Sequence, residues 1–72
     1  MILNNVQKLT IQQLPVGEHY TIGGVAAGED KRYEVHRVTE LEYKVGVYAL
    51  MICLDVDYVQ SPEEVISYIE TH

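Results

Sequence analysis

The last twelve residues of the chain have the clearest pattern of hydrophobic and polar positions. Ser61 precedes Pro62, and Glu64 stands three positions after Ser61, which is the arrangement that starts a capped helix. Apolar residues then recur at helical spacing and form one stripe. The stripe consists of Val65, Ile66, Tyr68 and Ile69. The pattern predicts a helix from Pro62 to about Glu70 with an acidic outer face.

Two stretches in the middle of the chain alternate between apolar and polar residues. The first covers residues 18–27, and the second covers residues 31–39. Residues 28–30, Gly-Glu-Asp, have the composition of a turn between them. Gly23 and Gly24 indicate a bulge or a close backbone approach in the first stretch. We therefore expect a β-hairpin.

A third strand is predicted from Leu41, because apolar and polar residues alternate as far as Val47. From residue 48 to residue 54 both faces are apolar, which is typical of a strand covered on both sides. A turn must fall near residues 40–42, since one strand from 31 to 58 would be too long. A short helix capped at Thr39 is the alternative, but the β-branched residues that follow favour a strand.

The first 14 residues have a weaker pattern. Apolar residues fall on one helical face, with Ile11 opposite them. They are Ile2, Leu3, Val6 and Leu9. Thr10 could instead cap a single turn over residues 11–14. We expect some helix before Pro15 in either case.

The length of 72 residues allows one domain, residues 1–72, since a second hydrophobic core would not fit. The predicted fold class is α+β. It has a small antiparallel sheet of about three strands, a C-terminal helix packed on one face and a short N-terminal helical segment. The helix stripe should contact alternate strand residues, namely Tyr20, Ile22, Val35 and Val47.

Charge is unevenly distributed along the chain, whose formal net charge is −6. All five Lys and Arg residues lie in the first 44 positions, which are close to neutral. Residues 45–72 contain five acids and no Lys or Arg. These acids are Asp55, Asp57, Glu63, Glu64 and Glu70. The acidic balance argues against direct binding to nucleic acid, because phosphate contacts need a surplus of Lys and Arg.

The longest apolar run, residues 45–54, is too short for a membrane span, which needs about 20 residues. The single cysteine, Cys53, cannot form an internal disulfide, and the N-terminus has no cationic region of the kind that starts a signal peptide. These features predict a cytoplasmic protein that does not bind membranes. Cys53 stands between Ile52 and Leu54, so we expect it to be buried and structural.

Candidate chemistry is sparse, and we expect no catalytic residue, metal or cofactor. Asp55 and Asp57 would point to one side of a strand and could hold a hard cation or act as acid and base. A metal needs a third ligand, and neither HxxxH nor CxxC spacing is present. A hairpin that turns at residues 29–30 would place His19 opposite Glu40, so the histidines would not be neighbours across the strands.

The leading hypothesis is a non-catalytic interaction module that presents its acidic C-terminal third to a basic protein partner. One form of it is an inhibitor that occupies the groove of a nucleic-acid-binding protein. The predicted partner-binding residues are Asp55, Asp57, Tyr58, Glu63, Glu64 and Glu70.

Two alternatives remain open. The first is a homodimer or larger homo-oligomer that uses an exposed strand edge or some of the six tyrosines. The second is a small metal protein or enzyme built on Asp55, Asp57 and a histidine.

Overall fold

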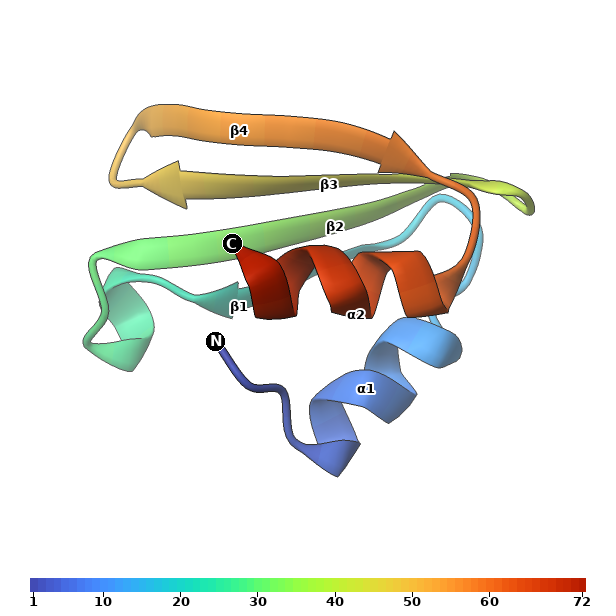
Figure 1. Cartoon of the computed structure of the whole chain (residues 1–72), viewed down its shortest axis with the longest axis horizontal. Coiled ribbons are helices and arrows are strands. Elements are labelled where there is room, and N and C mark those ends of the chain that lie inside the picture. Colours follow the sequence, from blue (N-terminus) through green and yellow to red (C-terminus); the bar gives the residue numbers. More distant parts are fainter.

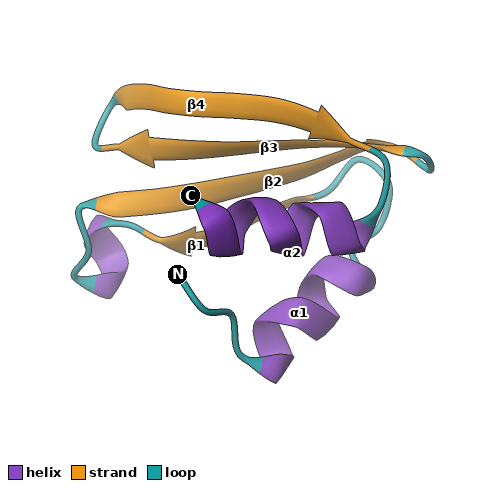
Figure 2. Cartoon of the chain, in the orientation of Figure 1, coloured by secondary structure: helices purple, strands orange, loops and turns teal.

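The computed structural model describes all 72 residues and has an α+β fold, as the sequence predicts (Figures 1 and 2). Two helices, one short 3₁₀ turn and four strands follow one another along the chain. In order they are α1 (Asn5–Gln12), β1 (His19–Gly23), η1 (Val25–Ala27), β2 (Lys31–Thr39), β3 (Glu42–Ala49), β4 (Ile52–Val59) and α2 (Pro62–Thr71). Neither helix is long and apolar enough to cross a membrane.

The four strands form one antiparallel sheet in the order β1-β2-β3-β4, so each strand pairs with its neighbour in the sequence. Both helices lie on the same face of this sheet, and α2 runs alongside the strands (Figure 1). We call this the helix face and its opposite the open face. β1 and β4 form the two edges of the sheet. No helix lies over β4 (Figure 1).

Side-chain caps define where both helices begin. The Asn4 side chain accepts a hydrogen bond from the backbone N–H of Gln7, and the Gln7 side chain accepts one from the N–H of Asn4. This reciprocal pair is a capping box. At α2 the Ser61 hydroxyl accepts from the N–H of Glu64 at 3.2 Å. The sequence predictions of a helix starting at Pro62 and of helix before Pro15 are both confirmed.

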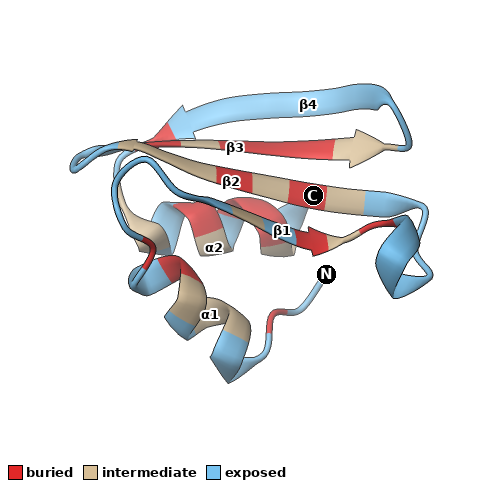
Figure 3. Ribbon diagram, turned by 180° about the vertical axis from the view of Figure 1, so that it is seen from behind, coloured by how far each residue is buried: buried red, intermediate tan, exposed pale blue.

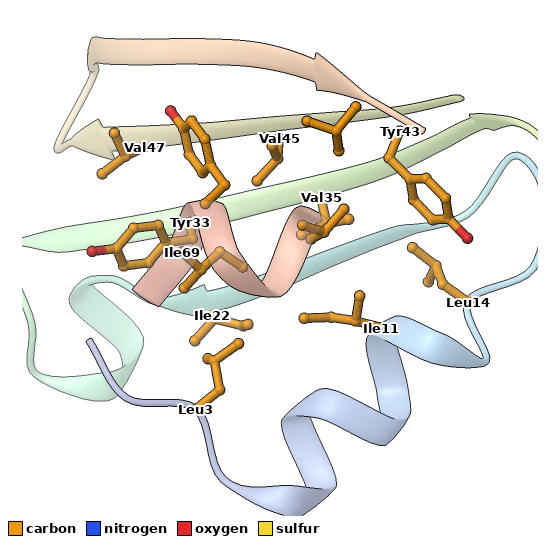
Figure 4. Packing of buried hydrophobic residues seen from close by; sticks show 13 residues of the cluster. Leu3, Ile11, Leu14, Ile22, Tyr33, Val35, Tyr43, Val45, Val47 and Ile69 are labelled. Atoms are coloured by element: carbon orange, nitrogen blue, oxygen red, sulfur yellow. The ribbon is translucent and has the colours of Figure 1, made fainter. Parts of the chain in front are cut away.

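One hydrophobic layer between the sheet and the helices holds the fold together (Figure 4). Each large apolar side chain buried there stabilises the fold by roughly 1.5–3 kcal/mol. Thirteen residues are buried: Leu3, Ile11, Leu14, Ile22, Tyr33, Val35, Tyr43, Val45, Val47, Val59, Val65, Tyr68 and Ile69. Tyr20 and Ile66 are partly buried against this layer. This layer contains Val65 and Ile69 of α2 together with Ile22, Val35 and Val47 of the strands, so the prediction that the C-terminal helix packs on one face of the sheet is confirmed.

The predicted apolar face of the N-terminal helix is wrong. Val6 and Leu9 are exposed, and Ile11 on the other side of α1 is fully buried. Leu3 before the helix and Leu14 after it are also buried. These flanking residues turn α1 so that Ile11 faces the sheet together with them, an effect that the periodicity of an eight-residue helix does not reveal.

The prediction of about three strands differs from the structure by one strand. The turn near residues 40–42 is present, but the stretch predicted as one strand from 41 to 54 is divided by a second turn at Leu50 and Met51. Leu50 adopts a φ of 55°, the only positive φ outside glycine. An L-residue rarely takes this left-handed conformation, so the sequence carries no turn signal there.

The register of the first hairpin also differs from the prediction. His19 pairs with His36 rather than with Glu40. The short η1 turn lengthens the connection between β1 and β2 and shifts the centre of the hairpin toward the N-terminus. Because the partner moves by an even number of residues, the same side chains still face the core. The two histidines, in contrast, become direct neighbours.

We predict that Leu50→Gly raises the free energy of unfolding by about 0.5–1 kcal/mol, because glycine adopts the left-handed conformation without a steric penalty. Urea unfolding of wild type and variant measures this difference. Met51→Gly is the matched control, since Met51 lies in the same turn and lacks a positive φ. It should lower stability by about 0.5–1 kcal/mol. Equal losses from both substitutions would contradict the prediction.

Candidate interaction surface on the last strand and helix

Asp55 and Asp57 lie on the helix face of the sheet. They pair across the ladder with Val47 and Val45, whose side chains are buried in the core on that face. Both aspartates are nevertheless exposed, because β4 lies beyond the helices at the edge of the sheet (Figure 3). The prediction that the two side chains point to one side of a strand is therefore correct.

The Asp55 carboxylate joins β4 to the C-terminal end of α2. Its Oδ2 accepts a hydrogen bond from the hydroxyl of Tyr68 at 2.8 Å and lies 3.4 Å from Nε2 of His72. The Tyr68 and His72 rings are stacked, with centroids 3.9 Å apart. Asp55 thus has a structural role in addition to its charge.

The environment of Tyr68 raises the pKa of its hydroxyl well above the usual value near 10. Burial is the main cause, because it disfavours the charged phenolate. The hydrogen bond to Asp55 and the negative charges of Asp55, Asp57 and Cys53 add to the shift in that order. Tyr68 therefore remains a neutral donor to the aspartate.

Glu63 and Glu64 occupy the first turn of α2, where the helix dipole favours negative charge. Glu64 stands four residues before Tyr68, so both lie on the flank of α2 that faces β4. Its Oε1 lies 3.3 Å from the Ser61 hydroxyl. Glu63 stands seven residues before Glu70 and therefore lies on the other flank of α2, away from β4. We use the term acidic surface for the exposed carboxylates of β4 and of this first turn, namely Asp55, Asp57, Glu63 and Glu64.

Glu70 contacts the N-terminal segment of the chain rather than β4. Its side chain is half-buried and accepts a hydrogen bond from the backbone N–H of Leu3 at 3.1 Å. It therefore connects the end of α2 with the segment that precedes α1. The sequence groups Glu70 with the other acids by charge, whereas the structure engages it in a contact within the chain.

Tyr58 is separated from the acidic side chains by the sheet itself. It is exposed on the open face, where it pairs with Lys44. Its backbone N–H donates to Oδ1 of Asp57 at 2.8 Å. The predicted partner-binding residues of β4 thus divide between two faces, with the aspartates on one and Tyr58 on the other.

The arginines are engaged in contacts away from the acidic surface. Nε of Arg32 lies 2.6 Å from Glu34, and its guanidinium lies over the ring of Tyr48 at 4.8 Å. Arg37 donates to the backbone carbonyls of Leu14 and Glu40.

The ion pairs of the structure leave most of the acidic surface unneutralised. Lys31 donates to the main-chain oxygen of His72 and contacts none of the side chains of the acidic surface. The close contacts between basic and acidic side chains are Arg32–Glu34 and His72–Asp55, and the second is an ion pair only when His72 is protonated. Asp57, Glu63 and Glu64 therefore have no cationic partner within the chain.

The open face carries a pair of histidines that the sequence prediction missed. The His19 and His36 rings are stacked, with centroids 4.0 Å apart. They line a shallow hollow whose wall also includes Lys44 and Tyr48. The ring of Tyr48 lies across Gly46, where a Cβ atom would come within 2.9 Å of it. Only the shifted register of the first hairpin brings these histidines together.

The prediction that Cys53 is buried is wrong, because Cys53 is exposed. It lies on the edge strand, where the register of β3 and β4 shifts between Val47 and Tyr48. The apolar neighbours that suggested burial, Ile52 and Leu54, are themselves exposed.

The acidic surface offers carboxylate oxygens as acceptors for the side chains of Lys and Arg on another molecule. No group of three or more His, Cys, Asp and Glu side chains is arranged to hold a metal ion. Comparison of the chain with protein-family models, curated proteins and solved structures gives no match.

We predict that Tyr68→Phe lowers the free energy of unfolding by about 1 kcal/mol at neutral pH. A hydrogen bond to a charged group contributes about 1.5–3 kcal/mol, and the partial exposure of Asp55 reduces this value. Urea unfolding measures the loss. Asp55→Asn and the double variant complete a thermodynamic cycle, and additive losses would show that the two groups do not interact.

The same pair predicts a pH dependence. An unfolded tyrosine ionises near pH 10, whereas folding raises the pKa of Tyr68, so the folded state retains this proton to higher pH. The stability that Tyr68 contributes is complete below about pH 10 and declines above it. Wild type should lose stability faster than Tyr68→Phe between about pH 9.5 and 11 in urea titrations. Parallel curves would contradict this assignment.

Proposed function

We propose that this protein is a non-catalytic interaction module that presents the acidic surface to a basic surface of a protein partner. The observation that carries the proposal is that Asp57, Glu63 and Glu64 are exposed and have no cationic partner within the chain. Their charges are therefore available to Lys and Arg of another molecule. Where the partner normally binds nucleic acid, the module would act as an inhibitor by occupying the site of the phosphates.

Electrostatics gives such a surface a defined role in binding. A patch of one sign increases the rate of encounter with a patch of the opposite sign, and salt screens this attraction over about 10 Å at 0.1 M. The charges also lie on regular elements, since β4 pairs with β3 along its length and the first turn of α2 is followed by the fully buried Val65. A partner would therefore meet charges in fixed positions.

The test compares wild type with the triple variant Asp57→Asn, Glu63→Gln, Glu64→Gln. These substitutions remove charge and keep the side-chain size, and the amide introduced at position 57 retains an oxygen that can accept from the N–H of Tyr58. Asp55 is left unchanged because it binds Tyr68. Each protein is immobilised, incubated with lysate of the source organism at low and high salt, and its retained proteins are identified by mass spectrometry. We expect wild type to retain a basic partner at low salt and the triple variant to retain at least tenfold less.

The matched control is the triple variant Glu18→Gln, Glu29→Gln, Asp30→Asn, which changes the net charge equally at exposed sites outside the acidic surface. It should retain the partner as wild type does. If both triple variants lose the partner equally, net charge rather than the acidic surface determines binding. If neither variant loses it, the proposal is wrong.

A further inference from the structure

The outer edge of β4 is exposed along almost its whole length (Figure 3). Its apolar side chains have large exposed fractions, with 65% for Ile52, 53% for Leu54, 41% for Val56 and 57% for Tyr58. A register shift interrupts the first part of the strand between Cys53 and Asp55, and residues 55–59 form its regular part. A regular edge strand with exposed apolar residues is a template for pairing with another strand. Known recognition modes use such an edge to add an extended peptide to the sheet.

The backbone of β4 shows which groups are directed outward. The N–H of Tyr58 donates to the Asp57 carboxylate and is therefore not engaged with β3. In an antiparallel ladder the N–H and C=O of alternate residues point the same way, so those of Val56 also point outward. Val56 thus offers a free donor and acceptor at the edge, and the contact with Asp57 covers the donor of Tyr58 in the isolated protein.

The two faces of β4 have opposite character. Asp55 and Asp57 lie on the helix face, whereas Val56 and Tyr58 lie on the open face. Because opposite residues of paired strands lie on the same face, an added strand meets carboxylates on one side and apolar groups on the other. The complementary strand therefore alternates basic and apolar residues.

A second copy of this chain fits the edge poorly. Antiparallel self-pairing about a two-fold axis at Val56 would place Asp55 of each copy opposite Asp57 of the other. Four carboxylates would then form one row, and like charges directly opposite each other destabilise a sheet. Lys or Arg at these positions would instead form favourable cross-strand pairs.

We propose that β4 binds an extended segment of the partner as a fifth, antiparallel strand in which Lys or Arg alternates with apolar residues. The basic side chains lie beside Asp55 and Asp57, and the apolar ones lie beside Val56 and Tyr58. This inference rests on the proposed function and specifies the form in which the partner is recognised.

The probe is a blocked octapeptide of four alternating Lys-Val repeats, whose affinity for the full-length protein is measured by fluorescence anisotropy at low salt. A block peptide of four lysines followed by four valines has the same composition and charge. In the antiparallel pairing the valines lie opposite Val56 and Tyr58 and direct their N–H groups toward β4. Methylation of the valine nitrogens therefore removes the pairing donors, whereas methylation of the lysine nitrogens leaves them intact.

We expect the alternating peptide and its lysine-methylated form to bind similarly. The block peptide and the valine-methylated form should bind at least tenfold more weakly. Val56→Pro should lower the affinity of the alternating peptide to the same extent, since an outward-facing N–H of an edge strand is a position that tolerates proline. Circular dichroism verifies that this variant is folded, and the peptide series on the wild-type protein does not depend on it.

The outcomes separate this inference from the proposed function. Equal binding of the alternating, block and methylated peptides, all weakened by the acidic-surface variant Asp57→Asn, Glu63→Gln, Glu64→Gln, would overturn strand addition and leave the proposed function standing. Peptide binding that this triple variant does not weaken would count against the proposed function. A dimer in sedimentation experiments that Val56→Pro dissociates would assign the edge to a second copy and overturn the inference.

Discussion

The two helices cover only one face of the four-stranded sheet and leave most of β4 exposed, with Asp55 as its contact to the end of α2. Most features of the molecule depend on this limit. Val45 on β3 is fully buried, whereas its neighbour across the ladder, Asp57 on β4, is exposed. A 72-residue chain has too little helix to cover every strand on both faces. Polar and charged residues on β4 and on the open face are therefore compatible with the fold, and these are the positions available for binding.

The sequence predicts an element correctly where neighbouring residues in the chain determine its structure. The cap at Ser61, the proline at the first helical position and the apolar stripe together predicted α2 within one residue of its observed end. The strand alternation also predicted which residues face the core, because this pattern depends only on the two-residue period of a strand. Burial of Val35 and Val47 follows from it.

The sequence pattern does not reveal features that depend on the pairing of strands. Leu50 gives no indication of a turn, because its left-handed conformation is imposed by the pairing of β3 with β4 rather than favoured by leucine itself. Without that turn, the apolar run around Cys53 suggested a covered strand, although it forms an exposed edge. The histidine pair was missed for a similar reason, since η1 shifts the register without changing the apolar pattern. Charge counting likewise could not separate Glu70, which binds Leu3, from Glu63 and Glu64.

The aspartates of β4 oppose pairing of this exposed apolar edge with the edge of an identical chain. Natural sheets protect their edges with charged residues, since the approach of an identical strand then brings like charges together. Asp57 adds a second protection, because its carboxylate binds the Tyr58 N–H that an incoming strand would need. These features oppose a strand of the same charge and favour a basic one, whose lysines or arginines can draw the carboxylate away from that N–H. The same side chains that discourage self-association thus select the chemistry of the partner that we propose for this edge.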